Sequence, residues 1–469
     1  MARISADQRS VSMSDIDRAE HGVRPQGSLL ILYPLIVDTV AFIVFLISSS
    51  RLAYVTVLGL ADITMMIIAL ASARRGFTML WQSLGISILV PAVLFAWAAA
   101  VSLAQQNGNI AFPLGSLRYL AWCLFTLRLI GGRRPKRGTT AVAGTGLPSN
   151  ANKQWVWIIC PFIAALAGIQ LIFSTQLSPA LIAIHNQLVD GESTNAVLTS
   201  IALGKAFASL TVRNPIELSY LGLALLCMSL SQRKGSFCAA TAFFIVVAGR
   251  SNVAIVSALA MILIHISHGR SVALTTRLAL LVVLPCILIF FAAFLPDIYL
   301  EPGASWDDLL FVLGQQRLGM LIALPDIAVH EGWRLLLFGT SQNLEETVAG
   351  LFASGLLPPL FEEGGAIAIF DVMWLGMLVV GGLPFVLGGV ILIRASWRAG
   401  SRLRSFPEAY ALRLYTVSIL IMSFSSQVLL SRYSLYFLSF FLANLAARTP
   451  RLIEHSPAVS KNSPNPVSL

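Results

Sequence analysis

Long apolar segments that alternate with short polar breaks are the dominant pattern of this 469-residue chain. Most of these segments approach the roughly 20 residues that an α-helix needs to cross a bilayer. The pattern predicts an all-α polytopic membrane protein with about twelve transmembrane helices. The expected spans lie near 29–49, 52–71, 83–104, 114–131, 155–174, 215–231, 236–249, 252–268, 278–295, 367–393, 412–430 and 433–447.

Two of the polar breaks are much longer than the others, 175–214 and 296–366. The second separates the expected ninth and tenth spans, is dense in charged side chains, and is predicted to form helices of its own. Another segment, 132–152, is basic and rich in Gly, Pro and Thr, which is typical of a flexible linker. The chain is thus expected to comprise a disordered tail 1–28, spans within 29–295, the loop 296–366, spans within 367–451 and a disordered tail 452–469.

Composition supports the membrane interpretation and excludes an ordinary soluble domain. Charged residues make up 12% of the chain, against about 25% in soluble proteins, and the mean hydropathy is +0.79. The net charge of +10 lies in short clusters between apolar segments. That distribution is typical of a polytopic protein, so the expected anionic partner is membrane lipid and no nucleic acid is expected.

The basic residues also predict an orientation, because cytoplasmic breaks carry the excess of Lys and Arg. With the N-terminus inside, rich and poor breaks alternate along the chain, which places both termini inside and both long loops outside. The inner breaks hold Arg74, Arg75, Arg133, Arg134, Lys136, Arg137, Arg233, Lys234, Arg270, Arg277, Arg394, Arg398, Arg402, Arg404, Arg448 and Arg451. The outer breaks hold Arg51, Lys205, Arg213, Arg250, Arg317, Arg334 and Arg432.

Arginines that remain on the outer side need an explanation, since topology selects against them there. The guanidinium fork suits phosphate and stays charged at any working pH. Each arginine could instead cap a helix C-terminus, pair with a carboxylate or meet lipid phosphate. For the set Arg213, Arg250 and Arg317 we favour a shared anion site on the outer face.

Motifs for nucleotide or metal chemistry are absent from the sequence. The chain has no GxxxxGK[ST], no GxGxxG opening a helix after a strand, no GxSxG and no HExxH. Asp307 and Asp308 are interpreted as a helix start rather than metal ligands. No metal and no cofactor is therefore predicted. The five cysteines fall in or beside apolar segments without metal-ligand spacing.

Several side chains in the long outer loop could contribute chemistry. His330 beside Glu331 could be a general base held by a carboxylate, although a loop histidine is more often part of the solvated surface. Trp306 and Trp333 suit an interfacial position and could also stack on sugar rings.

Two aspartates, Asp38 and Asp62, lie within expected spans, where a charge is costly. Each could face a polar cavity, pair with an arginine of a neighbouring helix, or be neutral near an interface. A proton relay is a further possibility. The two halves of the sequence show no repeat, which disfavours a coupled transporter.

Three stretches in order resemble the O-antigen polymerase and O-antigen ligase family of bacterial polytopic glycosyltransferases, which includes Wzy-type polysaccharide polymerases. They are Thr211–Leu226 (TVRNPIELSYLGLALL), Val246–Leu259 (VVAGRSNVAIVSAL) and Arg317–Gly339 (RLGMLIALPDIAVHEGWRLLLFG). The Gly-rich Asp371–Gly389 (DVMWLGMLVVGGLPFVLGG) follows them. The resemblance covers roughly residues 200–390 and the layout of the spans.

This resemblance implies a glycan on undecaprenyl diphosphate as the substrate, used at the periplasmic face of the inner membrane. It implies that Arg213, Arg250 and Arg317 bind the diphosphate and stabilise its charge as it leaves. It also implies a polymerase that joins repeat units into O-antigen, capsule or exopolysaccharide, with a chain-length regulator as a possible partner protein. The alternatives are a ligase of the same fold, and a flippase or transporter for lipid-linked glycan.

One departure from the family pattern concerns the general base. Ligases of this family carry a histidine near the start of the span after the large loop, where this chain has Asp371. That difference favours a polymerase and leaves the base unassigned. The candidates are His330, Glu362, Glu363 and Asp371.

Overall fold

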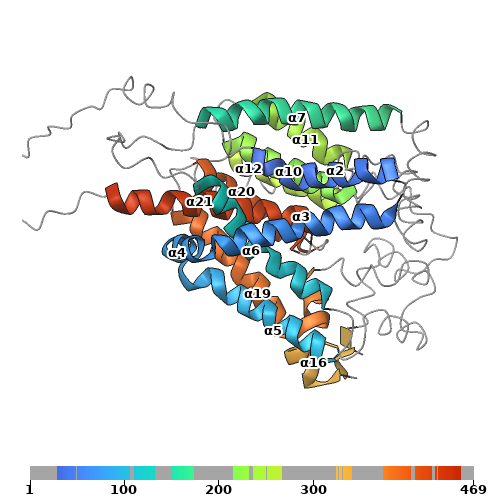
Figure 1. Cartoon of the computed structure of the whole chain (residues 1–469), viewed down its shortest axis with the longest axis vertical. Coiled ribbons are helices and arrows are strands. Elements are labelled where there is room, and N and C mark those ends of the chain that lie inside the picture. The colour runs from blue at the N-terminus through green and yellow to red at the C-terminus, as the bar shows by residue number, and fades with distance from the viewer. Residues whose placement is uncertain are drawn as a thin grey trace, which may run out of the picture.

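The structure, a computed structural model, describes a helical bundle (Figure 1). Its described residues are almost entirely helical, which confirms the predicted all-α class for this part of the chain. They are 29–48, 50–105, 110–131, 149–173, 215–231, 236–249, 251–266, 324–325, 327–329, 331–340, 373–402, 407–424, 428–429 and 431–455.

Two short 3₁₀ helices and thirteen α-helices are described in these ranges. They are η3 (Leu29–Leu32), α2 (Tyr33–Ser48), α3 (Arg51–Ala71), α4 (Ala73–Leu84), η4 (Gly85–Ile88), α5 (Leu89–Gln105), α6 (Ala111–Gly131), α7 (Ser149–Ile172), α10 (Pro215–Ser231), α11 (Ser236–Ala248), α12 (Asn252–Ile266), α16 (Trp333–Phe338), α19 (Met373–Arg402), α20 (Pro407–Met422) and α21 (Arg432–His455).

Among the described helices, four are long and apolar enough to cross a membrane: Leu30–Ser48, Leu52–Ala71, Gly85–Gln105 and Met373–Ser401. Shorter apolar helices occupy the expected spans around α7, α10, α11 and α12. The chain is therefore that of a membrane protein with several membrane-spanning helices. The expected span 278–295, the loop 175–214 and most of the loop 296–366 lie outside the described residues.

Several predicted boundaries need correction. The expected span 412–430 is α20, which ends at Met422, and the last span continues through the start of the predicted tail to His455. The end of the predicted linker 132–152 is also helical, because α7 begins at Ser149. Hydropathy misses these ends because polar residues at the end of a helix continue the backbone hydrogen bonds without adding apolar surface.

The polar break around Arg74 and Arg75 is a helix, α4, rather than a simple turn. Its 12 residues extend for about 18 Å, too short to cross a bilayer. Figure 1 shows α4 nearly end-on, whereas α3 and α5 lie across the view. Gly76, Leu80 and Leu84 are buried at helical spacing, and the arginines are exposed on the other side. This amphipathic pattern suits a helix that lies along a membrane surface.

The last helix, α21, lies at the centre of the hydrophobic core. It packs against α6, α4 and α20, and its rings meet those of earlier helices. Tyr436 contacts Trp122 of α6 edge-on, with ring centroids 5.7 Å apart, and stacks on Tyr33 of α2 at 5.9 Å. Its hydroxyl donates to the carbonyl of Leu30. The C-terminal helix thereby fixes the positions of α2 and α6.

The helix α19 breaks at Gly382, where φ is +69°. The end of α16 fills this break, because the N–H of Thr340 donates to the carbonyl of Val379 at 2.7 Å. Gly339 at the end of α16 also has positive φ. A Cβ at Gly339 would lie 2.5 Å from the Val379 carbonyl oxygen, and one at Gly382 would lie 2.7 Å from that of Leu336. Only paired glycines permit this backbone contact.

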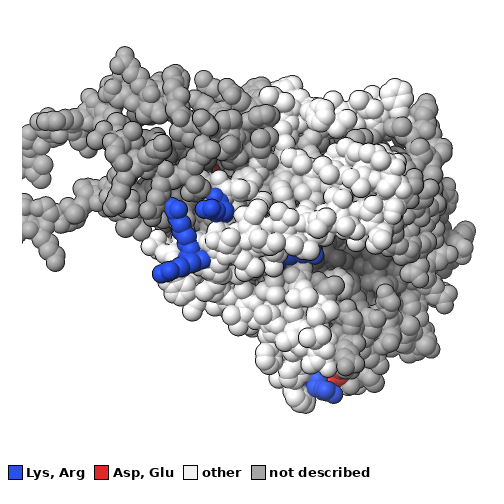
Figure 2. Space-filling view, viewed as in Figure 1, with Lys and Arg blue, Asp and Glu red and all other residues white. Residues whose placement is uncertain are grey.

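Charge is sparse on the surface of the described residues. Figure 2 shows basic side chains gathered near α4, a few charged atoms near α16, and one small basic patch on the mostly uncharged surface between them. Large apolar side chains of α2 and α3 are exposed on that surface, including Ile47, Leu52 and Leu70. An apolar surface of this kind is expected where helices face lipid rather than water.

Candidate functional site

The predicted site residues cannot be compared directly with the structure. Arg213, Arg250, Arg317, His330, Glu362, Glu363 and Asp371 all lie outside the described residues.

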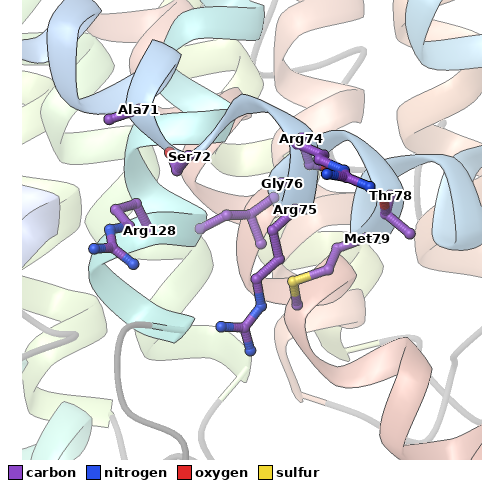
Figure 3. Close-up of a pocket in the computed structure, with 9 residues that line it drawn as sticks. Ala71, Ser72, Arg74, Arg75, Gly76, Thr78, Met79 and Arg128 are labelled. Atoms are coloured by element: carbon purple, nitrogen blue, oxygen red, sulfur yellow. Dashed lines mark hydrogen bonds between the residues drawn. The ribbon is translucent and has the colours of Figure 1, made fainter.

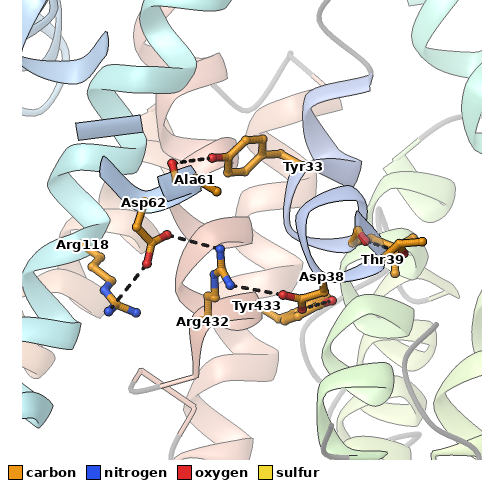
Figure 4. A network of polar contacts seen from close by, with 9 residues as sticks. Tyr33, Asp38, Thr39, Ala61, Asp62, Arg118, Arg432 and Tyr433 are labelled. Atoms are coloured by element: carbon orange, nitrogen blue, oxygen red, sulfur yellow. Dashed lines mark hydrogen bonds and ion pairs between the residues drawn. The ribbon is translucent and has the colours of Figure 1, made fainter. Parts of the chain in front are cut away.

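A cluster of four charged side chains, Asp38, Asp62, Arg118 and Arg432, lies inside the helical bundle (Figure 4). The guanidinium of Arg432 bridges both carboxylates, with Nη1 3.2 Å from Asp38 Oδ1 and Nη2 3.2 Å from Asp62 Oδ1. Arg118 approaches the other oxygen of Asp62 at 3.8 Å. The hydroxyl of Tyr433 donates to Asp38 Oδ2 at 2.7 Å. We call this set the charged cluster.

The charged cluster lies well below the surface that the α2–α3 turn defines. Asp38 lies about three turns before Ser48, where α2 ends. Asp62 lies about three turns after Arg51, where α3 begins. Both carboxylates are therefore about 15 Å from that turn along their helices. Because the hydrocarbon core is about 30 Å thick, a turn at one membrane surface places the cluster near mid-depth. Charged groups at that depth mark functional sites in membrane proteins.

The arginine reaches this depth because α21 begins at Arg432, where the side chain meets Asp38 of α2 and Asp62 of α3. In Figure 1, α2 and α3 reach beyond α20 and α21 on the side of the α2–α3 turn. Non-helical backbone is tolerated within a membrane only where protein buries it or water reaches it. Here Ser423 and Leu429 are buried. Two hydrogen bonds join Ser423 to the start of α19: the Met373 N–H donates to its carbonyl, and the Trp374 indole donates to its hydroxyl.

The charges of the cluster balance, and burial differs among its members. Asp38 has no exposed surface and the Arg432 side chain is 9% exposed, whereas Asp62 is 26% and Arg118 46% exposed. A buried carboxylate is stable only when it is paired and hydrogen-bonded. Arg432 and Tyr433 together satisfy Asp38. The exposed Arg118 leaves the cluster open on the side of α6.

The beginning of α10 lies beside the charged cluster. Glu217 is in the first turn of α10, and α10 packs against α21, the helix that carries Tyr433. This end of α10 also meets the end of α11, because the Ser219 hydroxyl donates to the Val246 carbonyl at 3.4 Å. The described residues that flank Arg213 and Arg250, namely Pro215, Gly249 and Ser251, therefore belong to one end of the bundle.

In the described part of the outer loop, Glu331 has a structural partner. The Thr340 hydroxyl donates to its Oε1 at 3.1 Å, and both residues are buried. The hydrogen bond joins Glu331, just before α16, to Thr340, just after it. Trp333 is exposed beside the exposed Leu336 and Leu337, which agrees with the interfacial position expected for it.

The pairing of Asp38 and Asp62 with arginine was one of the alternatives open in the sequence, and the structure confirms it. The identity of the partners, Arg432 and Arg118, was not predicted. Both are arginines in or beside expected spans, and charge complementarity with two intramembrane acids was the signal that could have indicated them. Glu217 was also missed, although it lies in one of the stretches that carry the family resemblance.

Among the described residues, no three His, Cys, Asp or Glu side chains gather as a metal site would require. In comparison with known proteins, the chain matches no family model and no curated protein.

Proposed function

We propose that this protein is an inner-membrane polysaccharide polymerase that joins undecaprenyl-diphosphate-linked oligosaccharide repeat units at the periplasmic face. Both termini are cytoplasmic in this proposal, and the product is O-antigen, capsule or exopolysaccharide. A chain-length regulator is a candidate partner protein. The proposal rests first on the resemblance carried by the stretches around Arg213, Arg250 and Arg317.

The observation that carries the proposal further is the meeting of the start of α10 with the end of α11. Pro215 begins α10 directly after the segment of Arg213, and Gly249 and Ser251 flank Arg250. The contact between Ser219 and Val246 brings these two parts of the chain together. A shared diphosphate site needs that proximity, because two arginines must reach one charged group.

The proposed reaction is a glycosyl transfer that needs no external energy source. A hydroxyl oxygen of the acceptor glycan forms a bond to the anomeric carbon of the donor. The bond from that carbon to the diphosphate oxygen breaks, and the lipid diphosphate leaves with the electron pair. The hydroxyl proton passes to a base, for which His330, Glu362, Glu363 and Asp371 are the candidates. Arg213, Arg250 and Arg317 offset the charge on the leaving group.

The charged cluster has a positioning role in this proposal. Arg432 holds α2 and α3 to the start of α21, and α21 packs against α10. Displacement of the α10 start would move the segment of Arg213 relative to the rest of the bundle. Positioning of this kind matters because small displacements of binding groups reduce glycosyl transfer strongly.

The test is elongation of a lipid-linked oligosaccharide by the purified protein in vitro. The parent protein is expected to produce a ladder of longer glycans, and the triple variant Arg213→Ala, Arg250→Ala, Arg317→Ala to produce none. A double variant, Arg394→Ala with Arg398→Ala, removes charge from α19 and is expected to retain the ladder. Full elongation by the triple variant at normal protein levels would contradict the site, and no elongation by the parent would contradict the function.

Two alternatives can be separated from the polymerase. A deletion strain that attaches single repeat units indicates loss of a polymerase, whereas unattached long chains indicate loss of a ligase. A transporter of lipid-linked glycan is favoured by one observation, the break of α19 at Gly382, because broken helices form transporter sites. That break is filled by the backbone of α16 rather than by open space, which makes transport the weaker candidate.

A further inference from the structure

A pocket of about 500 Å³ lies where α3 ends, α4 begins and α6 ends (Figure 3). Its polar lining comprises the side chains of Ser72, Arg74, Arg75, Thr78 and Arg128. In Figure 3 the side chains of Arg75, from α4, and Arg128, from α6, extend into the same space. We call this the arginine pocket, and it is independent of the charged cluster and of the proposed reaction.

Close packing of α4 on α6 creates the arginine pocket. A Cβ at Gly76 would lie 2.7 Å from a methyl carbon of Leu124, so the two helices approach as closely as a glycine allows. Arg75 precedes that contact on α4, and Arg128 follows Leu124 by one turn on α6. The two guanidinium groups therefore reach one pocket from different helices.

Among the described residues that line the arginine pocket, none is a carboxylate. Within the part of the chain that the structure describes, none of the side chains of Arg74, Arg75 and Arg128 forms a hydrogen bond or an ion pair, in contrast to Arg432. Positive charges that line one pocket repel one another, and an anion bound in the pocket reduces that cost. Phosphate is the matching group, because the planar fork of arginine binds its oxygens in pairs.

A second pocket, of about 350 Å³, adjoins the first at Thr78 and is almost entirely apolar. It is lined by Phe77, Thr78, Trp81, Ile88 and Leu89. A ligand that fits both pockets has a phosphate at one end and a hydrocarbon chain at the other. α4 has the amphipathic character of a helix at the boundary of headgroups and acyl chains.

We propose that the arginine pocket binds the phosphate of an anionic phospholipid, one of whose acyl chains lies in the apolar pocket against Trp81. Anionic lipid is enriched where basic residues next to spans attract it, and each arginine adds to the binding. The site is on the side of the membrane opposite to the α2–α3 turn, since α3 runs from that turn to α4.

The test uses the full-length protein in nanodiscs of phosphatidylcholine that contain a small fraction of lipid with brominated acyl chains, which quench nearby tryptophans. The fluorescence of Trp81 is obtained as the difference in tryptophan fluorescence between the parent protein and the variant Trp81→Phe. Brominated phosphatidylglycerol is expected to quench this signal more than brominated phosphatidylcholine at the same fraction. The variant Arg75→Gln with Arg128→Gln is expected to bind phosphatidylglycerol at least roughly tenfold more weakly.

The matched control is Arg394→Gln with Arg398→Gln, which removes the same charge from exposed positions on α19 outside the pocket and is expected to keep the difference. Equal quenching by the two lipids in the parent would overturn the proposal. So would a difference that survives in the Arg75 and Arg128 variant. Equal quenching by the two lipids, together with binding of inorganic phosphate that the Arg75 and Arg128 variant loses, would identify a site for free phosphate instead of lipid.

Discussion

Two groups of arginines in this protein have opposite surroundings. In the charged cluster, Arg432 is buried and bridges two carboxylates at 3.2 Å each. In the arginine pocket, Arg75 and Arg128 are exposed, and the described residues of the lining include no carboxylate. The first group is neutralised by the protein itself. The second has no carboxylate partner among the described residues, and in our proposal a lipid phosphate balances its positive charge.

This difference separates a structural arginine from a binding arginine. A buried carboxylate and its partner hold helices in place, because loss of either partner leaves an uncompensated charge. Exposed arginines lose little when a neighbour changes, because water solvates them. We therefore expect the charged cluster to control stability and the arginine pocket to control ligand binding.

The largest expected effect is that of Arg432→Met, which leaves Asp38 buried without its ion pair. Removal of one partner of a buried pair costs about 3–5 kcal/mol. Cys123, Cys160, Cys227 and Cys238 are buried, so a thiol-reactive dye reports thermal unfolding of the protein in detergent. Unfolding at the parent's temperature would contradict the structural role of Arg432.

The combination of Arg432→Met with Asp38→Asn and Asp62→Asn is expected to recover most of that loss. Replacement of all partners of a buried ion pair by neutral groups is often close to neutral in stability, and the amide oxygen introduced at position 38 could still accept the Tyr433 hydroxyl. The same dye assay measures the recovery. A triple variant as unstable as Arg432→Met would show that the packing of the arginine side chain matters more than its charge.

A smaller loss is expected for Arg432→Lys. Lysine keeps the charge but loses the fork that reaches both carboxylates, so one hydrogen bond to a charged group is lost. That loss corresponds to about 1.5–3 kcal/mol. A midpoint between those of the parent and Arg432→Met supports the bridging geometry, whereas a midpoint equal to the parent's would contradict it.

The smallest effects are expected at the exposed arginines. Arg118→Ala removes a contact of 3.8 Å from a side chain that is 46% exposed, and such pairs contribute about 0–1 kcal/mol. Arg128→Ala is expected to change stability by less than about 0.5 kcal/mol while it weakens lipid binding. A large loss of stability in Arg128→Ala would remove the contrast between the two groups.

The sequence predicted the helical class and many of the helix positions, because both depend on local hydrophobic pattern. The spans expected at 215–231 and 236–249 coincide with α10 and α11 within one residue. The prediction was weaker for a helix that contains many polar residues and is held in place by packing against other helices. α4 was interpreted as a break because its hydropathy is low, although its buried face packs against α6 and α21.

The site was predictable only in part. Asp38 and Asp62 were recognised as residues that need a partner, since their cost in a membrane is a property of the residue and its segment. The choice of Arg432 was not predictable, because 370 residues separate it from Asp62. The predicted diphosphate site of Arg213, Arg250 and Arg317 lies outside the described residues and stays a prediction.

Hydrophobic pattern, charge distribution and composition by themselves determined that this chain is a helical membrane protein with acids inside its spans. Each of these properties is encoded over about 20 neighbouring residues. Tertiary structure alone decided which arginines are neutralised and which are open to a ligand. That distinction depends on distances between helices, and the packing of α3, α4 and α21 against α6 sets those distances.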